Sequence, residues 1–334
     1  MNSFSNKIIS WYKSNKRDLP WRNTKDAYLI WLSEIILQQT RVEQGMNYYL
    51  NFATTYPTVK HLAKADNDDV MKLWQGLGYY SRARNLHTTA KIITDKYKGK
   101  FPDDYADILS LKGIGEYTAA AIASFAFDKP HAVVDGNVFR VLARVFGIET
   151  PIDTSQGKKE FYALANELLD KKHAALHNQS IMEFGAIQCK PVSPDCSVCP
   201  LNTMCFAFAS KRVGELPVKA KTTKVRNRYF NYIVLHHAGT IAINKRTGKD
   251  IWTNLYDFPL IETTKEFTEE EFLSSKEWKT FMGKNKYSIK SISPIYKHIL
   301  SHQKIYARFF EVECKASLEK IITSSAIILS LIHI

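Results

Sequence analysis

Apolar residues recur at three- and four-residue spacing along most of the first 211 positions, and polar or Gly/Pro breaks separate the segments. This spacing is typical of helices that bury one face. The expected helices cover residues 3–14, 26–39, 42–53, 67–74, 81–97, 103–110, 116–125, 137–146, 157–170 and 173–187. The pattern therefore predicts an all-α region over residues 1–210.

The pattern changes after residues 211–228, a segment with seven basic groups, one acidic group and little periodic apolar content. We expect this segment to be an exposed linker. Beyond it, β-branched and aromatic residues predict strands at 229–237, 239–244, 290–300 and 305–314, with one helix near 268–282. Cys314 alternates with Phe310 and Val312 and should face inward. Residues 229–334 are thus expected to form a smaller α+β domain.

Composition agrees with a folded chain and adds a clue about partners. Hydrophobic residues make up 45% of the 334 residues, which is enough to bury a core. The net charge is +13, with 32 basic and 22 acidic groups in residues 1–230 against 14 and 11 in the rest. This excess favours a polyanion partner, although solvated lysine faces produce it too.

The chain has no apolar core of signal-peptide type near its N-terminus and no stretch of roughly 20 apolar residues. We therefore expect a cytoplasmic protein without membrane contact. The apolar run Ala326 to Ile334 is too short to span a bilayer and should be a packed or frayed tail.

Four of the five cysteines crowd into one segment with the spacing C-x6-C-x2-C-x5-C: Cys189, Cys196, Cys199 and Cys205. Clustered thiols in a chain without a secretion signal indicate a metal before a disulfide. Four thiolates can hold a zinc ion or a 4Fe-4S cluster. Two short C-x2-C pairs would favour zinc, and this segment has one.

Gly113 and Gly115, in LKGIGEYTAAAIASF, fall in a turn between the helices expected at 103–110 and 116–125. Glycines let backbone N–H groups approach a phosphate, and the following helix N-terminus adds its positive dipole end. A lone GxG pattern is usually only a turn. The segment 103–125 is nevertheless a candidate for gripping a nucleic-acid backbone.

Two carboxylates stand in apolar surroundings. Glu34 lies among Trp31 and Ile35 in an expected helix, so it is either a surface residue or a partly desolvated acid with a raised pKa. Asp135 directly precedes the apolar helix that Asn137 opens. From spacing alone, a helix cap is the leading interpretation of Asp135.

Taken in order, LSEIILQQT, LKGIGEYTA, VVDGNVF and the cysteine spacing resemble the MutY-type adenine DNA glycosylases of the endonuclease III superfamily. The resemblance implies a helix-hairpin-helix fold with a six-helix barrel, one 4Fe-4S cluster on the four cysteines, and a nudix-like C-terminal domain. The implied activity is monofunctional hydrolysis of adenine mispaired with 8-oxoguanine or G. The implied partner is double-stranded DNA, bound by a monomer at the nucleoid.

The resemblance also assigns roles to single residues. Glu34 would protonate the adenine, Asp135 would stabilise the cationic sugar, and Tyr117 and Asn137 would line the catalytic region. Tyr117 stands where relatives that cleave the strand carry a lysine, so no Schiff base is expected. The implied DNA and base contacts are Gln39, Thr40, Leu77, Tyr79, Arg82, Gly113, Gly115, Gln179, Ser301 and His302.

The C-terminal domain resembles the family through IWTNLYDFPLIE and lacks the glutamate-rich box of active nudix hydrolases, so recognition is expected there. Leu300-Ser301-His302 matches a family Phe-Ser-His loop that checks for 8-oxoguanine, with leucine in place of phenylalanine. A polar hairpin turn is the alternative.

Two rival functions stay open: a glycosylase/lyase of oxidised pyrimidines, and a non-catalytic iron-sulfur DNA-binding protein. Tyr117 and Glu34 oppose the first of these, and the two carboxylates oppose the second.

Overall fold

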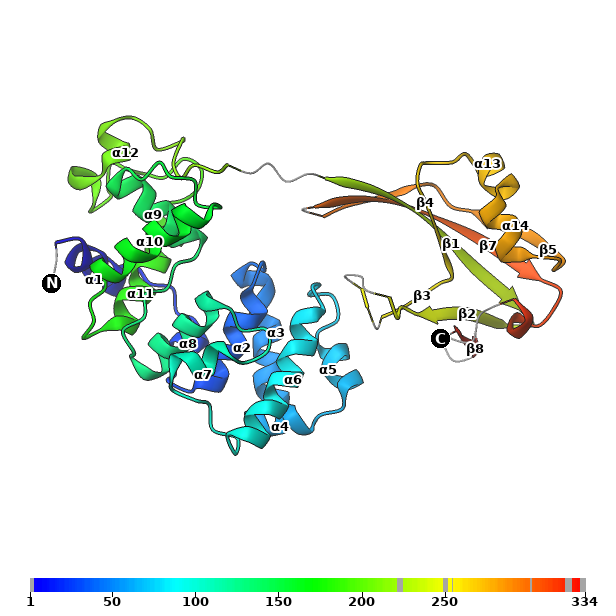
Figure 1. The fold of residues 1–334 in the computed structure, drawn as a ribbon, viewed down its shortest axis with the longest axis horizontal. Coiled ribbons are helices and arrows are strands. Elements are labelled where there is room, and N and C mark those ends of the chain that lie inside the picture. Colours follow the sequence, from blue (N-terminus) through cyan, green and yellow to red (C-terminus); the bar gives the residue numbers. More distant parts are fainter. Residues whose placement is uncertain are drawn as a thin grey trace. The chain divides into compact units, whose positions relative to one another are not determined.

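The structure is a computed structural model that describes residues 3–220, 225–248, 252–253, 255–300, 302–321 and 326–330. The chain divides into two compact units, Met1–Lys221 and Thr222–Ile334 (Figure 1). Each unit has a hydrophobic core of its own, and each is described by itself. None of the described helices is both long and apolar enough to cross a membrane.

The first unit is helical, as the apolar spacing predicts. Its main helices are α1 (Ser3–Asn15), α2 (Ala27–Leu37), α3 (Val42–Thr55), α4 (Val59–Lys64), α5 (Asn67–Leu73), α6 (Ser81–Lys96), α7 (Tyr105–Leu109), α8 (Glu116–Phe127), α9 (Gly136–Phe146), α10 (Ser155–Leu168), α11 (Ala174–Glu183) and α12 (Phe206–Ala209). The sequence pattern misses α4 because its six residues are too few to display a period. The helix expected at 173–187 continues past Glu183 as a π turn, Phe184–Gln188.

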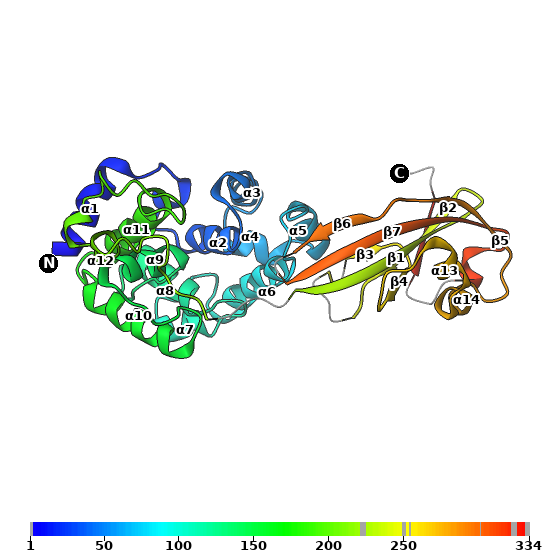
Figure 2. The same cartoon turned by 90° about the horizontal axis from the view of Figure 1, so that it is seen from above.

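Two large cores divide this unit into lobes, and a small third cluster, which includes Ile30, Phe125 and Val133, draws on both. The middle lobe packs α2 to α8 around a cluster that runs from Leu19 to Ala123. The terminal lobe joins the beginning of the chain, Phe4 to Ile9, to residues from Ala132 to Leu216. Figures 1 and 2 show α1 beside α11, far apart in sequence, and this pairing closes the terminal lobe.

The expectation of an exposed linker over residues 211–228 is wrong for its first part. Leu216 is buried, its carbonyl oxygen accepts a hydrogen bond from Arg144, and the carbonyl of Val218 accepts one from the Ile152 amide. Apolar residues at alternating positions, such as Leu216 and Val218, let this segment pack on the terminal lobe. Residues 221–224 lie outside the described residues, and strand β1 already begins at Arg226.

The described part of the second unit forms an eight-stranded sheet. Its strands are β1 (Arg226–His237), β2 (Thr240–Lys245), β3 (Tyr256–Asp257), β4 (Leu260–Thr263), β5 (Tyr287–Ile292), β6 (Tyr296–Ile299), β7 (Gln303–Cys314) and β8 (Ala326–Ser330). The long strands β1 and β7 pair in parallel at the centre, and β8 places part of the apolar tail against β2. Residues 331–334 lie outside the described residues.

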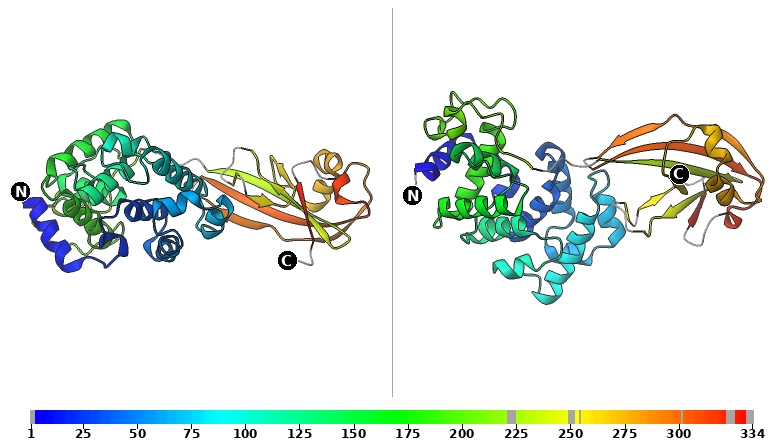
Figure 3. Two further views of the ribbon diagram at one scale, coloured as in Figure 1. Left: turned by 90° about the horizontal axis from the view of Figure 1, so that it is seen from below. Right: turned by 45° about the horizontal axis from the view of Figure 1, so that its top comes forward.

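Two helices, α13 (Glu269–Ser274) and α14 (Lys276–Met282), cover one face of the β1–β7 pair (Figure 3). Phe272 and Trp278 pack there against Phe310, and Cys314 is buried in the same core, which confirms its inward orientation. The sequence predicts a single helix here, but Ser275 ends α13 and caps α14. The single strand expected at 290–300 is likewise two strands, β5 and β6, interrupted around Pro294.

Candidate active site

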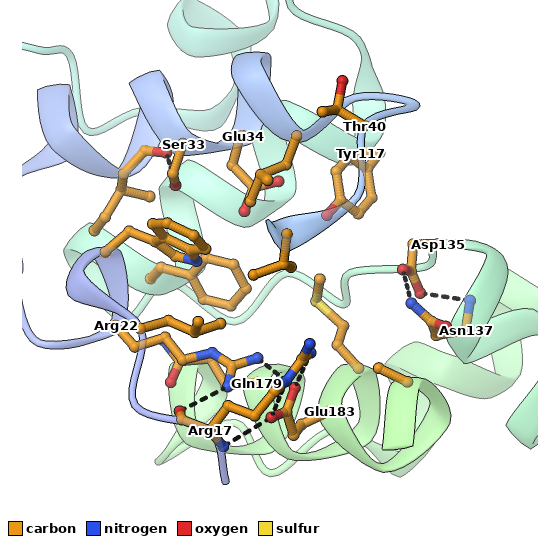
Figure 4. A pocket seen from close by; sticks show the side chains of 18 residues that line it. Arg17, Arg22, Ser33, Glu34, Thr40, Tyr117, Asp135, Asn137, Gln179 and Glu183 are labelled. Atoms are coloured by element: carbon orange, nitrogen blue, oxygen red, sulfur yellow. Dashed lines mark hydrogen bonds and ion pairs between the residues drawn. The ribbon is translucent and has the colours of Figure 1, made fainter. Parts of the chain in front are cut away.

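The two lobes of the helical unit enclose a pocket of about 220 Å³. Its walls include six residues that the sequence singles out: Glu34, Thr40, Tyr117, Asp135, Asn137 and Gln179. Figure 4 shows Tyr117 beside Glu34, and Asp135 with Asn137 on an adjoining wall. These residues come from four different helices, one helix cap and, for Thr40, the turn after α2, so folding alone brings them together.

Glu34 enters the pocket from α2, a helix whose other residues are almost all apolar and buried. Burial raises the pKa of its carboxyl group to about 7, against the opposing effect of a hydrogen bond from Tyr117. The pKa of Tyr117 lies well above its ordinary value, first because of burial and then because of the two nearby carboxylates. The phenol therefore stays protonated as a donor to Glu34, which itself can carry a proton near neutral pH.

Asp135 is the N-cap of α9, as its spacing suggests. Its Oδ1 accepts hydrogen bonds from the amides of Asn137 (2.9 Å) and Val138 (2.8 Å), and its Oδ2 accepts one from the Asn137 side chain (2.7 Å). Burial raises the pKa of the carboxyl, and these three bonds oppose the rise. The cap holds the carboxylate fixed at the pocket wall.

The pocket wall opposite Glu34 is charged and consists of Arg17, Arg22 and Glu183, which the sequence analysis does not predict. Glu183, fully buried on α11, accepts bonds from Arg17 Nη2 and Arg22 Nη2, each 2.7 Å long. Burial alone would raise the pKa of Glu183, but the two arginines outweigh it and hold the pKa at about 2. Gln179 lies on the same helix and accepts a bond from Tyr12. Only the long-range fold reveals this wall, because its partners are more than 160 positions apart.

The four clustered cysteines line one small cavity beside α9. Arg144 Nη1 donates to Cys189 Sγ (3.4 Å), and Arg140 Nε donates to the Cys189 carbonyl oxygen (2.8 Å). Arg140 also donates to Asn137 Oδ1 (2.8 Å), so the cysteine loop is tied to the helix that Asp135 caps. No trio of His, Cys, Asp or Glu side chains in the described part of the chain has the geometry of a single metal ion site.

The hairpin glycines form a turn between α7 and α8. Gly113 has φ +79°, which only a residue without a Cβ adopts readily, and a Cβ there would meet the Asn85 side chain at 2.7 Å. Gly115 is the N-cap of α8 without a side-chain cap, and a Cβ placed there would meet no atom within 4 Å. The turn therefore presents uncapped backbone N–H groups.

Two of the expected DNA contacts are exposed at turns. Gln39 follows α2 with φ +55°, and Tyr79 precedes α6 with φ +49° and 43% of its surface exposed. Leu77 is buried in the middle lobe, because the Gly76-Gly78 turn directs it inward. Its side chain is therefore not presented at the surface of this structure, and its insertion into a duplex stays a prediction.

Arg82 is also not placed for a phosphate contact. Its guanidinium is buried and donates to carbonyl oxygens of Ile35, Ile36 and Gln38. These internal acceptors engage the guanidinium in this structure, so a phosphate contact of Arg82 stays a prediction.

In the second unit, the turn between β6 and β7 carries the residues that match the family loop. The Leu300 amide donates to Gln303 (2.8 Å), and the His302 carbonyl accepts from the Arg226 amide (3.1 Å). His302 is exposed, and Ser301 lies outside the described residues. The geometry is that of a hairpin turn, so a recognition role for this turn stays a prediction.

Comparison with known proteins shows which protein family the chain belongs to. Residues 32–170 match the family model of the HhH-GPD superfamily base excision DNA repair proteins, and residues 231–327 match the NUDIX domain. The adenine DNA glycosylase of Buchnera aphidicola subsp. Schizaphis graminum is 35% identical over 304 residues, which are 90% of this chain and 84% of that protein. The chain belongs to the adenine DNA glycosylase family.

Solved structures agree with this fold. A thermostable thymine-DNA glycosylase is 31% identical, with a TM-score of 0.58 over 62% of this chain and 95% of that chain. An endonuclease III in a non-covalent DNA complex is 21% identical, with a TM-score of 0.54 over 62% and 94%. The predicted fold class, a helix-hairpin-helix region followed by a nudix-like domain, is confirmed. The chain is a DNA-binding hydrolase of base excision repair that removes adenine.

Proposed function

We propose that this glycosylase removes adenine mispaired with 8-oxoguanine or G, and that Glu34 and Asp135 carry the chemistry. The observation that supports this most is one pocket holding a carboxyl group with a pKa of about 7 and a second carboxylate fixed as a helix cap. Such a pair suits the removal of a purine, because the base must gain a proton while the sugar gains positive charge.

Glu34 is the proton donor in this proposal. Adenine leaves readily only when its ring is protonated, and Glu34 delivers a proton to N7 of the extruded base. Tyr117 lies beside this carboxyl group, and its hydrogen-bonding effect on the pKa of Glu34 is smaller than that of burial. Since the pKa of Glu34 is about 7, a large fraction of the enzyme carries this proton near neutral pH.

Asp135 faces the sugar. When the N-glycosidic bond breaks, the sugar develops oxocarbenium character, which a fixed carboxylate in a pocket stabilises without reorganisation. Water then completes hydrolysis at the anomeric carbon. Asn137 holds the carboxylate in place through its side-chain amide.

The opposite wall would hold the base. Arg22, Glu183 and Gln179 present donors and acceptors to a ring that enters the pocket, and Thr40 lies at the rim on the Glu34 side. A base must leave the stack to reach this pocket, at a cost that is lower for a mismatch.

The DNA contacts follow from what is exposed. The amides after Gly113 and Gly115 bind a backbone phosphate, while Gln39 and Tyr79 enter the duplex at the extruded base. The turn at Ser301 and His302 reads 8-oxoguanine. The protein acts as a monomer at the nucleoid in the cytoplasm.

One 4Fe-4S cluster on Cys189, Cys196, Cys199 and Cys205 completes the proposal. All four thiols line one cavity with largely apolar walls, which fits a cluster that takes one thiolate per iron. Burial raises the pKa of Cys199 to about 11, so cluster binding would release protons. Bound there, the cluster would fix the loop that Arg140 and Arg144 tie to α9.

The deciding experiment incubates the protein with duplexes that contain A opposite 8-oxoguanine, A opposite G, or thymine glycol, and scores abasic sites and strand breaks separately. We expect adenine loss without strand cleavage, and no adduct trapped by borohydride, since no lysine is among the described pocket residues. Glu34→Gln should lower the single-turnover rate by at least about a hundredfold. Full activity in this variant would contradict the assignment of the acid.

A further inference from the structure

Two exposed turns of the middle lobe border the same buried guanidinium. One turn follows α2 and presents Gln39, and the other precedes α6 and presents Tyr79. Both residues have a left-handed backbone conformation. Residues other than glycine adopt it only where the surrounding structure holds them there. Arg82, on the first turn of α6 and 9% exposed, lies between these turns.

The fork of Arg82 joins the two turns. Nη1 lies within hydrogen-bond distance of the carbonyl oxygens of Gln38 (2.6 Å), Ile36 (2.9 Å) and Ile35 (3.0 Å), and Nη2 reaches those of Gly78 (3.2 Å) and Leu77 (3.5 Å). The first three carbonyls belong to the end of α2, where a helix lacks partners for its last acceptors. A cation also complements the negative end of that helix.

Aromatic rings hold the fork in place. The guanidinium lies 5.1 Å from the ring centroid of Trp74 and 5.5 Å from that of Tyr79. A planar group with donors on two sides can bond to the carbonyl oxygens of both turns at once, and a lysine ammonium group cannot replace the guanidinium in this role. The Gln38 side chain continues the connection to Thr118 Oγ1 (3.3 Å), next to Tyr117.

We propose that Arg82 is a positioning residue that couples the Gln39 turn to the Tyr79 turn, so that the two enter the duplex as one unit. The same bonds fix the end of α2, the helix that carries Glu34, and thereby align the acid with the extruded base. This inference rests on the proposed function in assigning Gln39 and Tyr79 to the duplex and Glu34 to protonation of the extruded base. It does not depend on which mispair is cut.

The first test compares Arg82→Lys and Arg82→Met with the wild type and with Tyr28→Phe. Tyr28 lies at the start of α2 and donates a buried bond to the Tyr56 carbonyl (2.6 Å), so its loss weakens the same core without touching either turn. Both Arg82 variants should lose at least about tenfold in single-turnover adenine excision at saturating enzyme, because small misplacements are costly. Their affinity for undamaged duplex should change little, and Tyr28→Phe should excise normally once folded.

The second test measures the coupling itself. The probe is a duplex with 2-aminopurine opposite guanine, whose fluorescence rises when the base leaves the stack. Gln39→Asn and Tyr79→Asn keep a residue that tolerates a left-handed backbone and remove the long side chain. Their effects on the fluorescence rise should be non-additive in the wild-type protein and additive in Arg82→Lys.

Additive effects in both backgrounds would overturn the coupling, as would wild-type excision by Arg82→Lys. The coupling would also be overturned if the excision rate of the Arg82 variants fell only in proportion to their folded fraction, as we expect for Tyr28→Phe. The fluorescence rise is read before excision begins, so the cycle reports extrusion from the duplex and not removal of the base. A wild-type protein that removes no adenine opposite 8-oxoguanine would instead overturn the proposed function.

Discussion

The ionisation of Glu34 should change both the stability of the fold and the excision rate with pH. Its folded pKa of about 7 exceeds the ordinary 4.5, so the folded state binds more protons between these values. Stability should therefore fall as pH rises from about 4.5 to 7. At pH 8, Glu34→Gln should be more stable than the wild type by up to about 3 kcal/mol, and this gain should shrink at pH 5.

Urea unfolding at the two pH values measures this gain. Glu43→Gln, which changes an exposed acid on α3, is the matched control and should show no such dependence. In the wild type, the excision rate at saturating enzyme should decline as pH rises through about 7, because the proton on Glu34 is lost. A flat profile between pH 6 and 8.5 would contradict Glu34 as the donor.

Gly185, in the π turn after α11, lies directly against Asn137 beside the Asp135 cap. A Cβ at this position would lie 2.6 Å from Asn137 Cβ and 2.9 Å from the Asn137 carbonyl oxygen. Gly185→Ala should displace Asn137, loosen the hold on Asp135, and lower excision by about a hundredfold. Gly136→Ala, one residue from Asp135, meets nothing within 4 Å and should leave the rate nearly unchanged. Equal losses in the two variants would mean that crowding is not the cause.

The ion pairs of Glu183 tie α11 to the segment that precedes α2. Glu183→Gln leaves Arg17 and Arg22 without their carboxylate and should cost about 3 kcal/mol in the free energy of unfolding at pH 7. Because the folded pKa of Glu183 is about 2, wild-type stability from this contact should disappear as pH falls from about 4.5 to 2. The variant should lack that acid-sensitive component.

Glu149→Gln provides the comparison, since its partner Arg212 forms an exposed pair on the surface. Exposed pairs contribute little, so this variant should unfold like the wild type. Urea titrations at pH 7 and pH 3 distinguish the two outcomes, and similar losses in both variants would show that burial of Glu183 is not decisive.

Helical spacing predicts most elements of the first unit because each helix buries one apolar face along a continuous stretch. Local motifs also predict Glu34 and Asp135 as candidates, although nothing in the spacing brings them into one pocket. The Arg17–Glu183 wall depends on contacts across more than 160 residues, which leave no local pattern. Leu77 and Arg82 are both buried, next to the turn at Gly76 and Gly78. No apolar spacing in the sequence predicts the direction of this turn.

At the scale of the whole chain, the pocket that holds Glu34 and Asp135 and the hairpin of Gly113 and Gly115 both lie within the first unit. A protein of residues 1–221 should therefore still remove adenine from A opposite G at saturating concentration. If the turn at His302 reads 8-oxoguanine, the preference for A opposite 8-oxoguanine over A opposite G should fall in this shorter protein. Single-turnover assays on both duplexes measure the preference, and its full retention would show that the second unit is not the reader.

The two lobes of the helical unit also differ in which parts of the chain form them. The middle lobe uses an unbroken stretch, whereas the terminal lobe needs α1 and residues up to Leu216, and Ser5 Oγ donates to the Leu168 carbonyl (2.8 Å). During synthesis, the middle lobe can fold before the partners of α1 exist, because Phe4 packs against Phe146 and Ser5 bonds to Leu168, both far downstream. The pocket between the lobes can thus form only after the chain reaches α11, and until then the apolar face of α1, with Phe4, Ile8 and Ile9, lacks its partners and is open to a chaperone.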